Sequence, residues 1–247
     1  MKKIGIALGG GGSRGFAHLG AIKALREKGI YPDVFSGTSA GSIAAALLAA
    51  KKTPDEIFEI LKDIKLTDAT NVTLPINGFA ALDDLREMLD EILEGKNFSD
   101  LEHKLFVCVS NLYTGGVEYL TSGNVARAVQ ASSSIPILFT PVEINGQLYV
   151  DGGLIDNVPI EPLIDECDYI IAIDLMPVKI VEKVEGISDI IVRMIQISAA
   201  IQADKKEYCD VLIRLEEVAD YNILDMNHNR KIFEIGYEIV KNMDISL

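Results

Sequence analysis

A cluster of glycines near the N-terminus constrains the fold of this chain more than any other feature. Five of the 20 glycines in 247 residues fall within the seven positions from Gly9 to Gly15. The apolar run Ile4–Leu8 before them predicts a strand, and the alanine-rich segment after them predicts a helix. A loop so poor in side chains exposes successive backbone N–H groups at a helix start, where negative charge is favoured. The cluster therefore predicts an anion-binding turn, for a bound phosphate or for a transient oxyanion.

Apolar segments rich in β-branched residues recur along the chain and alternate with helical patterns. Strands are predicted at Ile4–Leu8, Asp33–Ser36, Leu105–Asn111, Val117–Leu120, Tyr169–Asp174 and Val211–Leu215. The Asn145-Gly146 pair predicts a tight hairpin whose second strand ends directly before Asp151. Helices are predicted after the Thr53–Glu56 capping box, at 83–94 and at 229–241. The alternation predicts an α/β fold with a largely parallel sheet, and the lack of repeats or linkers predicts one domain, residues 1–247.

The composition argues against several classes of partner. Lys and Arg number 23 against 37 Asp and Glu, which gives a formal net charge of −14. Nucleic acid and strongly anionic membranes are bound through basic surfaces, so neither is an expected partner. The three cysteines lack CxxC spacing and predict reduced thiols in the cytoplasm. No signal peptide or transmembrane segment is expected, because serines and glycines interrupt the longest uncharged stretch, 34–50.

A second motif, Gly37-Thr38-Ser39-Ala40-Gly41, stands between a predicted strand and a predicted helix over 42–50. A serine on such a sharp turn holds its hydroxyl clear of the sheet, and small neighbours let the chain double back. The helix N-terminus favours negative charge developing near Ser39. Together with the glycine loop, this motif predicts acyl transfer, with Ser39 as the nucleophile and loop amides binding the tetrahedral oxyanion.

Two other interpretations of these motifs stay open. Gly10–Gly15 also matches GxGxxG, which would make the chain a Rossmann-like nucleotide-binding protein. That fingerprint needs an acidic residue at the end of the next strand, whereas Asp33 lies at its start. The chain could also be a lipid- or protein-binding module that keeps the fold but has lost turnover.

The nucleophile Ser39 needs a proton acceptor, and the candidates are the histidines and Asp151. Of the three histidines, His18 is expected to pack within a helix, His103 to lie in a surface turn and His228 to lie in the loop before the last helix. Only His228 follows Asp151 in the order of a Ser-Asp-His triad. Asp151 closes a strand and precedes Gly152-Gly153, which lets other backbone approach its carboxylate. In a dry site such a carboxylate can take the serine proton directly.

Taken in order over about 150 residues, the motifs resemble the patatin-like phospholipase family. They are GGGGxRG at Gly9–Gly15, GxSxG at Gly37–Gly41, ASxxxP at Ala131–Pro136, and Asp151-Gly152-Gly153 with Asn157-x-Pro159. The resemblance implies a three-layer α/β/α fold and a dyad of Ser39 as nucleophile and Asp151 as base. It implies an oxyanion hole built from the amides of Gly10, Gly11 and Gly12. Supporting positions in the motifs are Arg14, Gly15, Gly37, Ala40, Gly41, Gly152 and Gly153. The implied activity is hydrolysis of lipid acyl esters without a metal or a cofactor.

One further residue and three further segments have predicted structural or functional roles. Arg14 opposes the dipole of the helix that follows it, so we expect a carboxylate partner that locks the loop, with a substrate phosphate as the alternative. Ala131–Pro136 is expected to end a helix behind Ser39. The apolar segment Ile187–Ile201 predicts core packing, with a self-association face or an acyl-chain entrance as alternatives. Leu66–Leu82 is a lid candidate. The expected substrates are lipids or small esters, met as monomers, micelles or neutral interfaces rather than anionic bilayers.

Overall fold

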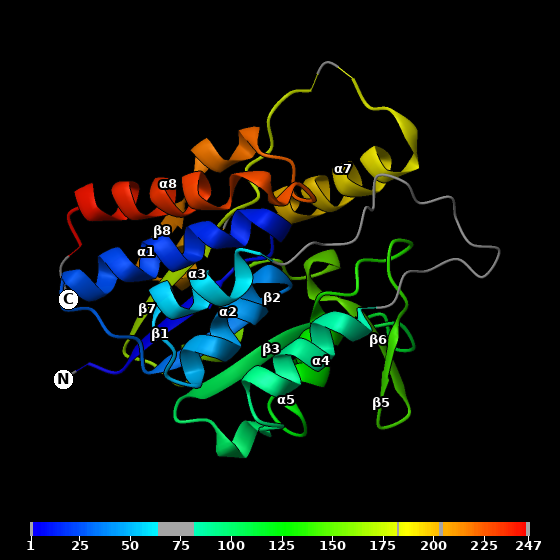
Figure 1. Cartoon of the computed structure of the whole chain (residues 1–247), viewed down its shortest axis with the longest axis horizontal. Helices are drawn as coiled ribbons and strands as arrows, with labels where there is room; N and C mark the ends of the chain where they lie inside the picture. The colour runs from blue at the N-terminus through cyan, green and yellow to red at the C-terminus, as the bar shows by residue number, and fades with distance from the viewer. Residues whose placement is uncertain (1, 64–81, 182, 203–204, 246–247) are drawn as a thin grey trace.

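One mixed β-sheet carries the fold in the computed structural model, which describes residues 2–63, 82–181, 183–202 and 205–245 (Figure 1). Five strands run parallel in the order β3, β2, β1, β7 and β8. Their bounds are Lys104–Asn111, Val34–Thr38, Ile4–Leu8, Tyr169–Asp174 and Val211–Arg214. Three antiparallel strands extend the sheet beyond β3: β4 (Val117–Leu120), β5 (Val142–Ile144) and β6 (Gln147–Asp151). Every predicted strand is confirmed, with ends that differ by one or two residues.

The register on β3 brings two distant parts of the chain together. β4 pairs with one edge of β3, and both β2 and β6 pair with the other edge. Thr38, the last residue of β2, lies opposite Cys108, and Asp151, the last residue of β6, lies opposite Val109. Because β2 and β6 run in opposite directions along this edge, their carboxyl ends meet there. The turn after Thr38 therefore faces Asp151.

The helices follow the local signals in the sequence. The helices of the described residues are α1 (Phe16–Glu27), α2 (Ala40–Ala49), α3 (Pro54–Leu61), α4 (Asp83–Ile92), α5 (Val125–Ser132), α6 (Glu161–Ile164), α7 (Gly186–Ile201) and α8 (Asn229–Asn242). The predicted capping box forms at the start of α3, where the Thr53 hydroxyl accepts from Glu56 N–H. α2 begins two residues earlier than expected, because β2 continues through Gly37 and the turn contains a single residue, Ser39.

Two cores cover the two faces of the sheet, as the alternation of side chains along β1 shows. Ile4, Ile6 and Leu8 point into the larger core, where α1, α2 and α8 pack, and α1 and α8 lie side by side in Figure 1. Ala7 points into a smaller core with residues of the α6 segment. Helices therefore lie on both faces, and the predicted α/β/α layering is confirmed.

The remaining expectations concern the lid candidate and membrane-spanning helices. The lid candidate Leu66–Leu82 lies outside the described residues, apart from Leu82 itself. Among the described helices, none is long and apolar enough to cross a membrane.

Candidate active site

Ser39 occupies the one-residue turn between β2 and α2 in a strained conformation. Its φ of 53° and ψ of −124° lie in a region that non-glycine residues adopt only where their surroundings hold them. The Ser39 N–H donates to the Ser132 Oγ over 2.9 Å, and the Ser39 carbonyl accepts from the Ser42 hydroxyl over 2.6 Å. Both serines are fully buried, so the turn is fixed from both sides.

The motif glycines are required by close backbone approach. A Cβ on Gly41 would lie 2.0 Å from the Leu8 carbonyl oxygen, and a Cβ on Gly37 would lie 2.5 Å from the Gly41 oxygen. A Cβ on Gly152 would likewise lie 2.5 Å from the Cys108 oxygen, and a Cβ on Gly15 would lie 2.9 Å from the side-chain Cβ of Ala40. Larger residues would push the turn away from the glycine loop.

Asp151 meets the serine from the end of β6. Its carboxylate accepts a hydrogen bond from the Gly153 N–H over 2.8 Å. Burial raises the pKa of Asp151 to about 6, and its interactions with the Ser39 side chain and the Gly153 N–H offset part of that rise. The predicted base therefore lies near Ser39, and its carboxyl group is more basic than that of a solvated aspartate.

The amides of the glycine loop are not equivalent. Gly9 N–H donates to Ile173 O over 3.0 Å, and Gly10 N–H donates to Asn157 O over 3.2 Å. Among the described residues, the N–H groups of Gly11 and Gly12 have no hydrogen-bond acceptor. Gly12 and Ser39 both line the same cavity. Two amides of the loop thus have no acceptor, one of them on a residue that lines the cavity with Ser39, and the Gly10 amide is already occupied.

Arg14 locks the loop, as expected, but through backbone carbonyls and not through a carboxylate. Its guanidinium is buried and donates to the carbonyls of Tyr221, Leu175 and Ala219 over 2.9 to 3.1 Å. The nearby charges of Asp174 and Asp220 act only through space. Burial lowers the pKa of Arg14 to about 10. The expected carboxylate partner was wrong because the segment around 219–221 folds over the helix start and presents carbonyl oxygens there.

None of the histidines contacts Ser39 or Asp151 in the described part of the chain. His18 is fully buried, its Nε2 lies 2.7 Å from Gly9 O, and burial lowers its pKa to about 4, so it supports the glycine loop as a neutral ring. His103 packs its ring against Phe35. His228 pairs with Asp225 over 3.2 Å on an exposed turn.

An apolar cavity of about 300 Å³ opens beside Ser39. Its walls come from the loop after β1, from α1, α2 and α4, and from the segments around Ile135 and Leu224. Phe16, Leu19 and Ile43 are among its apolar lining residues. Such a lining suits an aliphatic chain better than a polar group.

Two residues of the site, Ser132 and Asn157, lie in the family motifs, but their roles could not be predicted from the sequence. The Ser132 Oγ donates to Cys108 O over 2.6 Å while it accepts from Ser39, so it ties the turn to β3. Asn157 accepts from Gly10, and its Oδ1 would lie 2.8 Å from a Cβ on Gly10 and 3.0 Å from one on Gly153. Its buried Nδ2 has no partner among the described residues. Asn157 thus bridges the glycine loop and the loop after Asp151.

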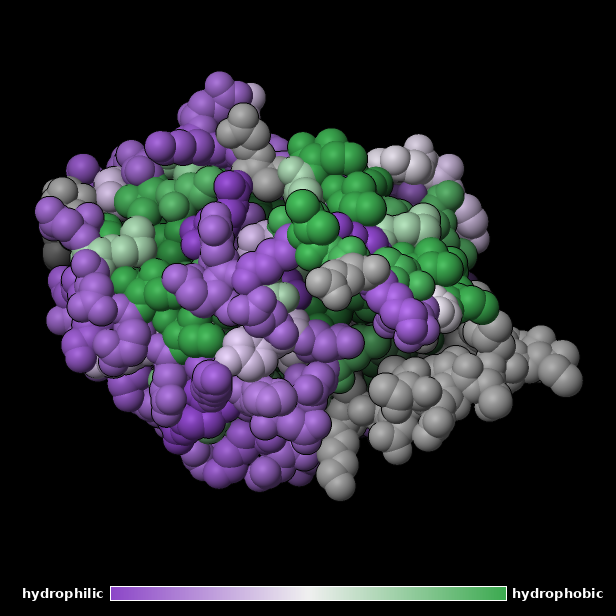
Figure 2. Space-filling view, turned by 90° about the horizontal axis from the view of Figure 1, so that it is seen from above, coloured by the Kyte–Doolittle hydropathy of each residue, from purple (hydrophilic) through white to green (hydrophobic). Residues whose placement is uncertain are grey.

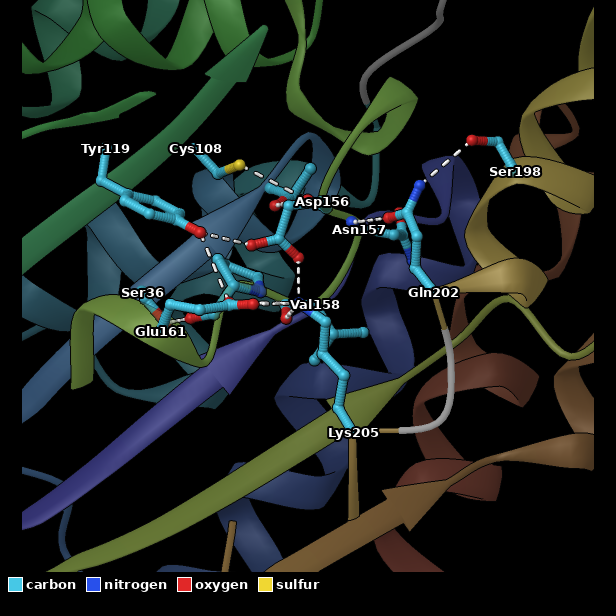
Figure 3. A network of polar contacts seen from close by, with 12 residues as sticks. Ser36, Cys108, Tyr119, Asp156, Asn157, Val158, Glu161, Ser198, Gln202 and Lys205 are labelled. Carbon is cyan, nitrogen blue, oxygen red and sulfur yellow. Dashed lines mark hydrogen bonds and ion pairs between the residues drawn. The ribbon is translucent and has the colours of Figure 1, made fainter. Parts of the chain in front are cut away.

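A polar network around Asp156 holds the segment that follows Asp151 (Figure 3). Asp156 accepts from the Tyr119 hydroxyl over 2.7 Å and pairs with Lys205, and its backbone carbonyl accepts from Thr38 Oγ1 over 3.0 Å. Lys205 also donates to Val158 O over 3.0 Å. The network fixes the chain between Asp151 and α6 against the end of β2.

The position of Asp33 argues against the nucleotide-binding alternative, which needs an acidic residue near the glycine loop. The Asp33 carboxylate accepts from Ile4 N–H over 2.9 Å, at the amino end of β1. The glycine loop follows the opposite, carboxyl end of that strand. Asp33 therefore cannot hold a ribose whose phosphates bind the loop.

Comparison with known proteins agrees with this geometry. Residues 6–164 match the family model for patatin-like phospholipases. An uncharacterized NTE family protein of Mycobacterium bovis is 33% identical over 177 residues, which cover 70% of this chain and 30% of that protein. Lysophospholipase NTE1 of Saccharomyces cerevisiae is 31% identical over 186 residues, covering 70% of this chain and 11% of the relative. This chain therefore spans less than a third of either curated relative.

A solved structure shares the fold. VipD from Legionella pneumophila superposes with a TM-score of 0.62 at 18% identity, over 97% of this chain and 66% of that one. The family model covers well over half of the chain, and the family's motifs meet at one place in the fold. The chain belongs to the patatin-like phospholipase family.

Proposed function

We propose that this chain is a serine acyl-ester hydrolase that acts on lipids through a dyad of Ser39 and Asp151. The observation that carries the proposal is a strained, buried serine whose side chain interacts with a buried carboxyl group, in a site with an apolar cavity and two loop amides that have no acceptor. Each of these parts is one that ester hydrolysis by an acyl-serine route requires.

The chemistry follows from the contacts. Asp151 takes the proton of the Ser39 hydroxyl as the serine oxygen attacks the ester carbonyl, and the acyl chain lies in the apolar cavity. The N–H groups of Gly11 and Gly12 stabilise the oxyanion, while Gly10 holds the loop through Asn157. The leaving alcohol takes the proton from Asp151, and an acyl-serine remains. Water activated by Asp151 then releases the fatty acid.

Family and geometry support a lipid ester as the substrate class. The yeast relative is named a lysophospholipase, and the cavity beside Ser39 is apolar. We extend the proposal to one domain over residues 1–247 and to a cytoplasmic location. One sheet that includes strands from both ends of the chain supports the first. Three free thiols, at Cys108, Cys167 and Cys209, support the second.

Covalent labelling tests the proposal directly. The folded chain is treated with a fluorophosphonate probe, and the labelled peptide is identified by mass spectrometry. We expect an adduct on Ser39 that is lost in Ser39→Ala and strongly reduced in Asp151→Asn. His228→Ala is the control and should keep labelling and ester hydrolysis. A folded protein without any adduct would refute the hydrolase, and an inactive His228→Ala protein would replace the dyad by a triad.

A further inference from the structure

Helix α7 differs from its predicted burial, because one side of it faces solvent. The apolar pattern of Ile187–Ile201 predicts packing in the core. Among the α7 residues whose burial the structure describes, only Ile191 and Ala199 are buried. Five large apolar side chains on the helix are exposed, at 46% to 81%: Ile187, Ile190, Met194, Ile197 and Ile201. We call these five residues the outer stripe.

The outer stripe is a continuous helical face. Its members are spaced by three or four residues, so their side chains lie along one side of α7. The chain just before α7 adds more exposed apolar side chains, at Val178, Val181 and Val184, with Ile180 99% exposed. Figure 2 shows hydrophobic residues gathered at the end of the molecule where Figure 1 places α7. An aliphatic surface of this extent is costly to leave in water.

The opposite side of α7 belongs to the wall of the proposed active site. Ile191 and Ile195 pack against Ile135, Phe139 and Leu224. Those last three residues line the cavity that contains Ser39. One helix thus separates the acyl-chain cavity from the outer stripe.

The carboxyl end of α7 is also hydrogen-bonded to the loop that follows Asp151. The Ser198 hydroxyl donates to Leu154 O over 2.8 Å. Asn157 N–H donates to Gln202 Oε1 over 2.9 Å, as Figure 3 shows. Asn157 in turn accepts from Gly10. The orientation of the outer stripe is therefore fixed relative to the glycine loop and the base.

We propose that the outer stripe docks the protein on an electrically neutral lipid surface, such as the zwitterionic face of a phosphatidylcholine membrane. The proposal rests on the proposed function, since the lipid surface is where the ester substrate is presented. The stripe is purely aliphatic apart from one methionine, whereas the centres of protein interfaces are enriched in aromatic residues and arginine. Insertion of its side chains into the acyl boundary is the usual way such a face is buried.

The charges beside the stripe indicate which lipid surface it fits. Lys179 pairs with Asp220, and Lys183 pairs with Glu185. Asp189 stands exposed on the helix itself. Anionic lipids are attracted by unpaired basic residues; here both lysines are paired with carboxylates, and the remaining basic residue of α7, Arg193, donates to Gln196 Oε1. A zwitterionic surface therefore matches this face, and the net charge of −14 opposes an anionic one.

Vesicle partitioning tests the docking surface. The variants are Ile190→Ser, Ile197→Ser and their combination, because serine and isoleucine have similar helix propensities. Ile164→Ser is the matched control, since Ile164 is 45% exposed, against 49% and 46% for Ile190 and Ile197. It lies at the other end of the sheet, in the segment that packs beside Gly5. Binding is measured by flotation with phosphatidylcholine vesicles, and catalysis by hydrolysis of a short-chain, water-soluble ester.

The wild-type protein should float with the vesicles. Each single substitution in the stripe should weaken partitioning about fivefold, and the double variant about 25-fold, because each side chain has about half of its surface left to bury. Ile164→Ser should bind as the wild type does, and all variants should hydrolyse the soluble ester equally.

Three results would overturn the docking proposal: no flotation of the wild type, equal flotation of the double variant, or a dimer in sedimentation that the double variant abolishes. Flotation with no hydrolysis of the soluble ester would support docking and refute the proposed function instead.

Discussion

The hydroxyl of Ser132 offers a direct test of what holds the nucleophile turn. It accepts from Ser39 N–H over 2.9 Å and donates to Cys108 O over 2.6 Å, all within the protein interior. Replacing Ser132 by alanine removes both bonds and leaves the buried Ser39 N–H without an acceptor. A lost hydrogen bond costs about 1 kcal/mol, and an unsatisfied buried donor costs about 1–3 kcal/mol. We expect Ser132→Ala to lower the free energy of unfolding by about 2–4 kcal/mol.

The neighbouring serine is a matched control. Ser133 is also buried, but its Oγ has no hydrogen-bond partner in the described structure. Ser133→Ala should therefore change the free energy of unfolding by about 0.5 kcal/mol or less. Both variants are compared with the wild type by urea unfolding at pH 7, with the slope against urea checked for constancy.

Ester hydrolysis provides a second measurement on the same two proteins. A displacement of the nucleophile by about 1 Å can cost about 10²-fold in rate, so Ser132→Ala should be slowed by a factor between 10 and 100. Equal unfolding free energies for the two alanine variants would refute the view that the Ser132 hydroxyl holds the turn.

Three further predictions concern charge around the site. Since burial raises the pKa of Asp151 from 3.8 to about 6, its protonated form stabilises the fold below about pH 4 and that contribution is lost as the pH rises through 6. Asp151→Asn should therefore gain up to about 3 kcal/mol over the wild type in urea unfolding between pH 4 and 7, and a constant difference would contradict the shift. A lysine at position 14 lacks the three-way fork of the guanidinium, so Arg14→Lys should cost about 2–4 kcal/mol in the same assay, whereas Arg86→Lys, at a partly exposed residue that pairs with carboxylates on its own helix, should cost about 0.5 kcal/mol or less. Asn157→Asp places a carboxyl group beside Asp151 and should move the pH midpoint of hydrolysis upward, while Asn157→Ser should slow the reaction without moving it.

Local rules predicted the parts of the site that depend on neighbouring residues in the sequence. The glycine loop, the one-residue turn at Ser39 and the hairpin before Asp151 each require small residues at fixed spacing, so the sequence shows them directly. The position of Asp151 beside Ser39 could not be derived this way, because it depends on β2 and β6 sharing one edge of β3. There the family resemblance supplied what periodicity could not.

Long-range contacts account for what the sequence left open or predicted wrongly. The partners of Arg14 lie about 160 to 207 residues away, and no local pattern marks a carbonyl as unpaired. The Gly10 amide is occupied by the carbonyl of Asn157, a residue that lies far from it in the sequence. Apolar residues lie around most of α7. The sequence pattern therefore could not distinguish the side that packs on Ile135 from the side that faces water.

The meeting of β2 and β6 on β3 also bears on when activity can arise. Ser39 and the glycine loop come from parallel strands near the N-terminus, while Asp151 arrives on an antiparallel strand that pairs with β3 only through residues 109–111. Two ladders must therefore close before the site is complete, the β2–β3 ladder across about 70 residues and the β3–β6 ladder across about 40, and each closure has an entropic cost. A newly made chain that has β1, β2 and β3 but not yet β6 holds the serine without its base. Under the proposed mechanism such a chain is latent, and lipid hydrolysis begins only when β6 has joined β3.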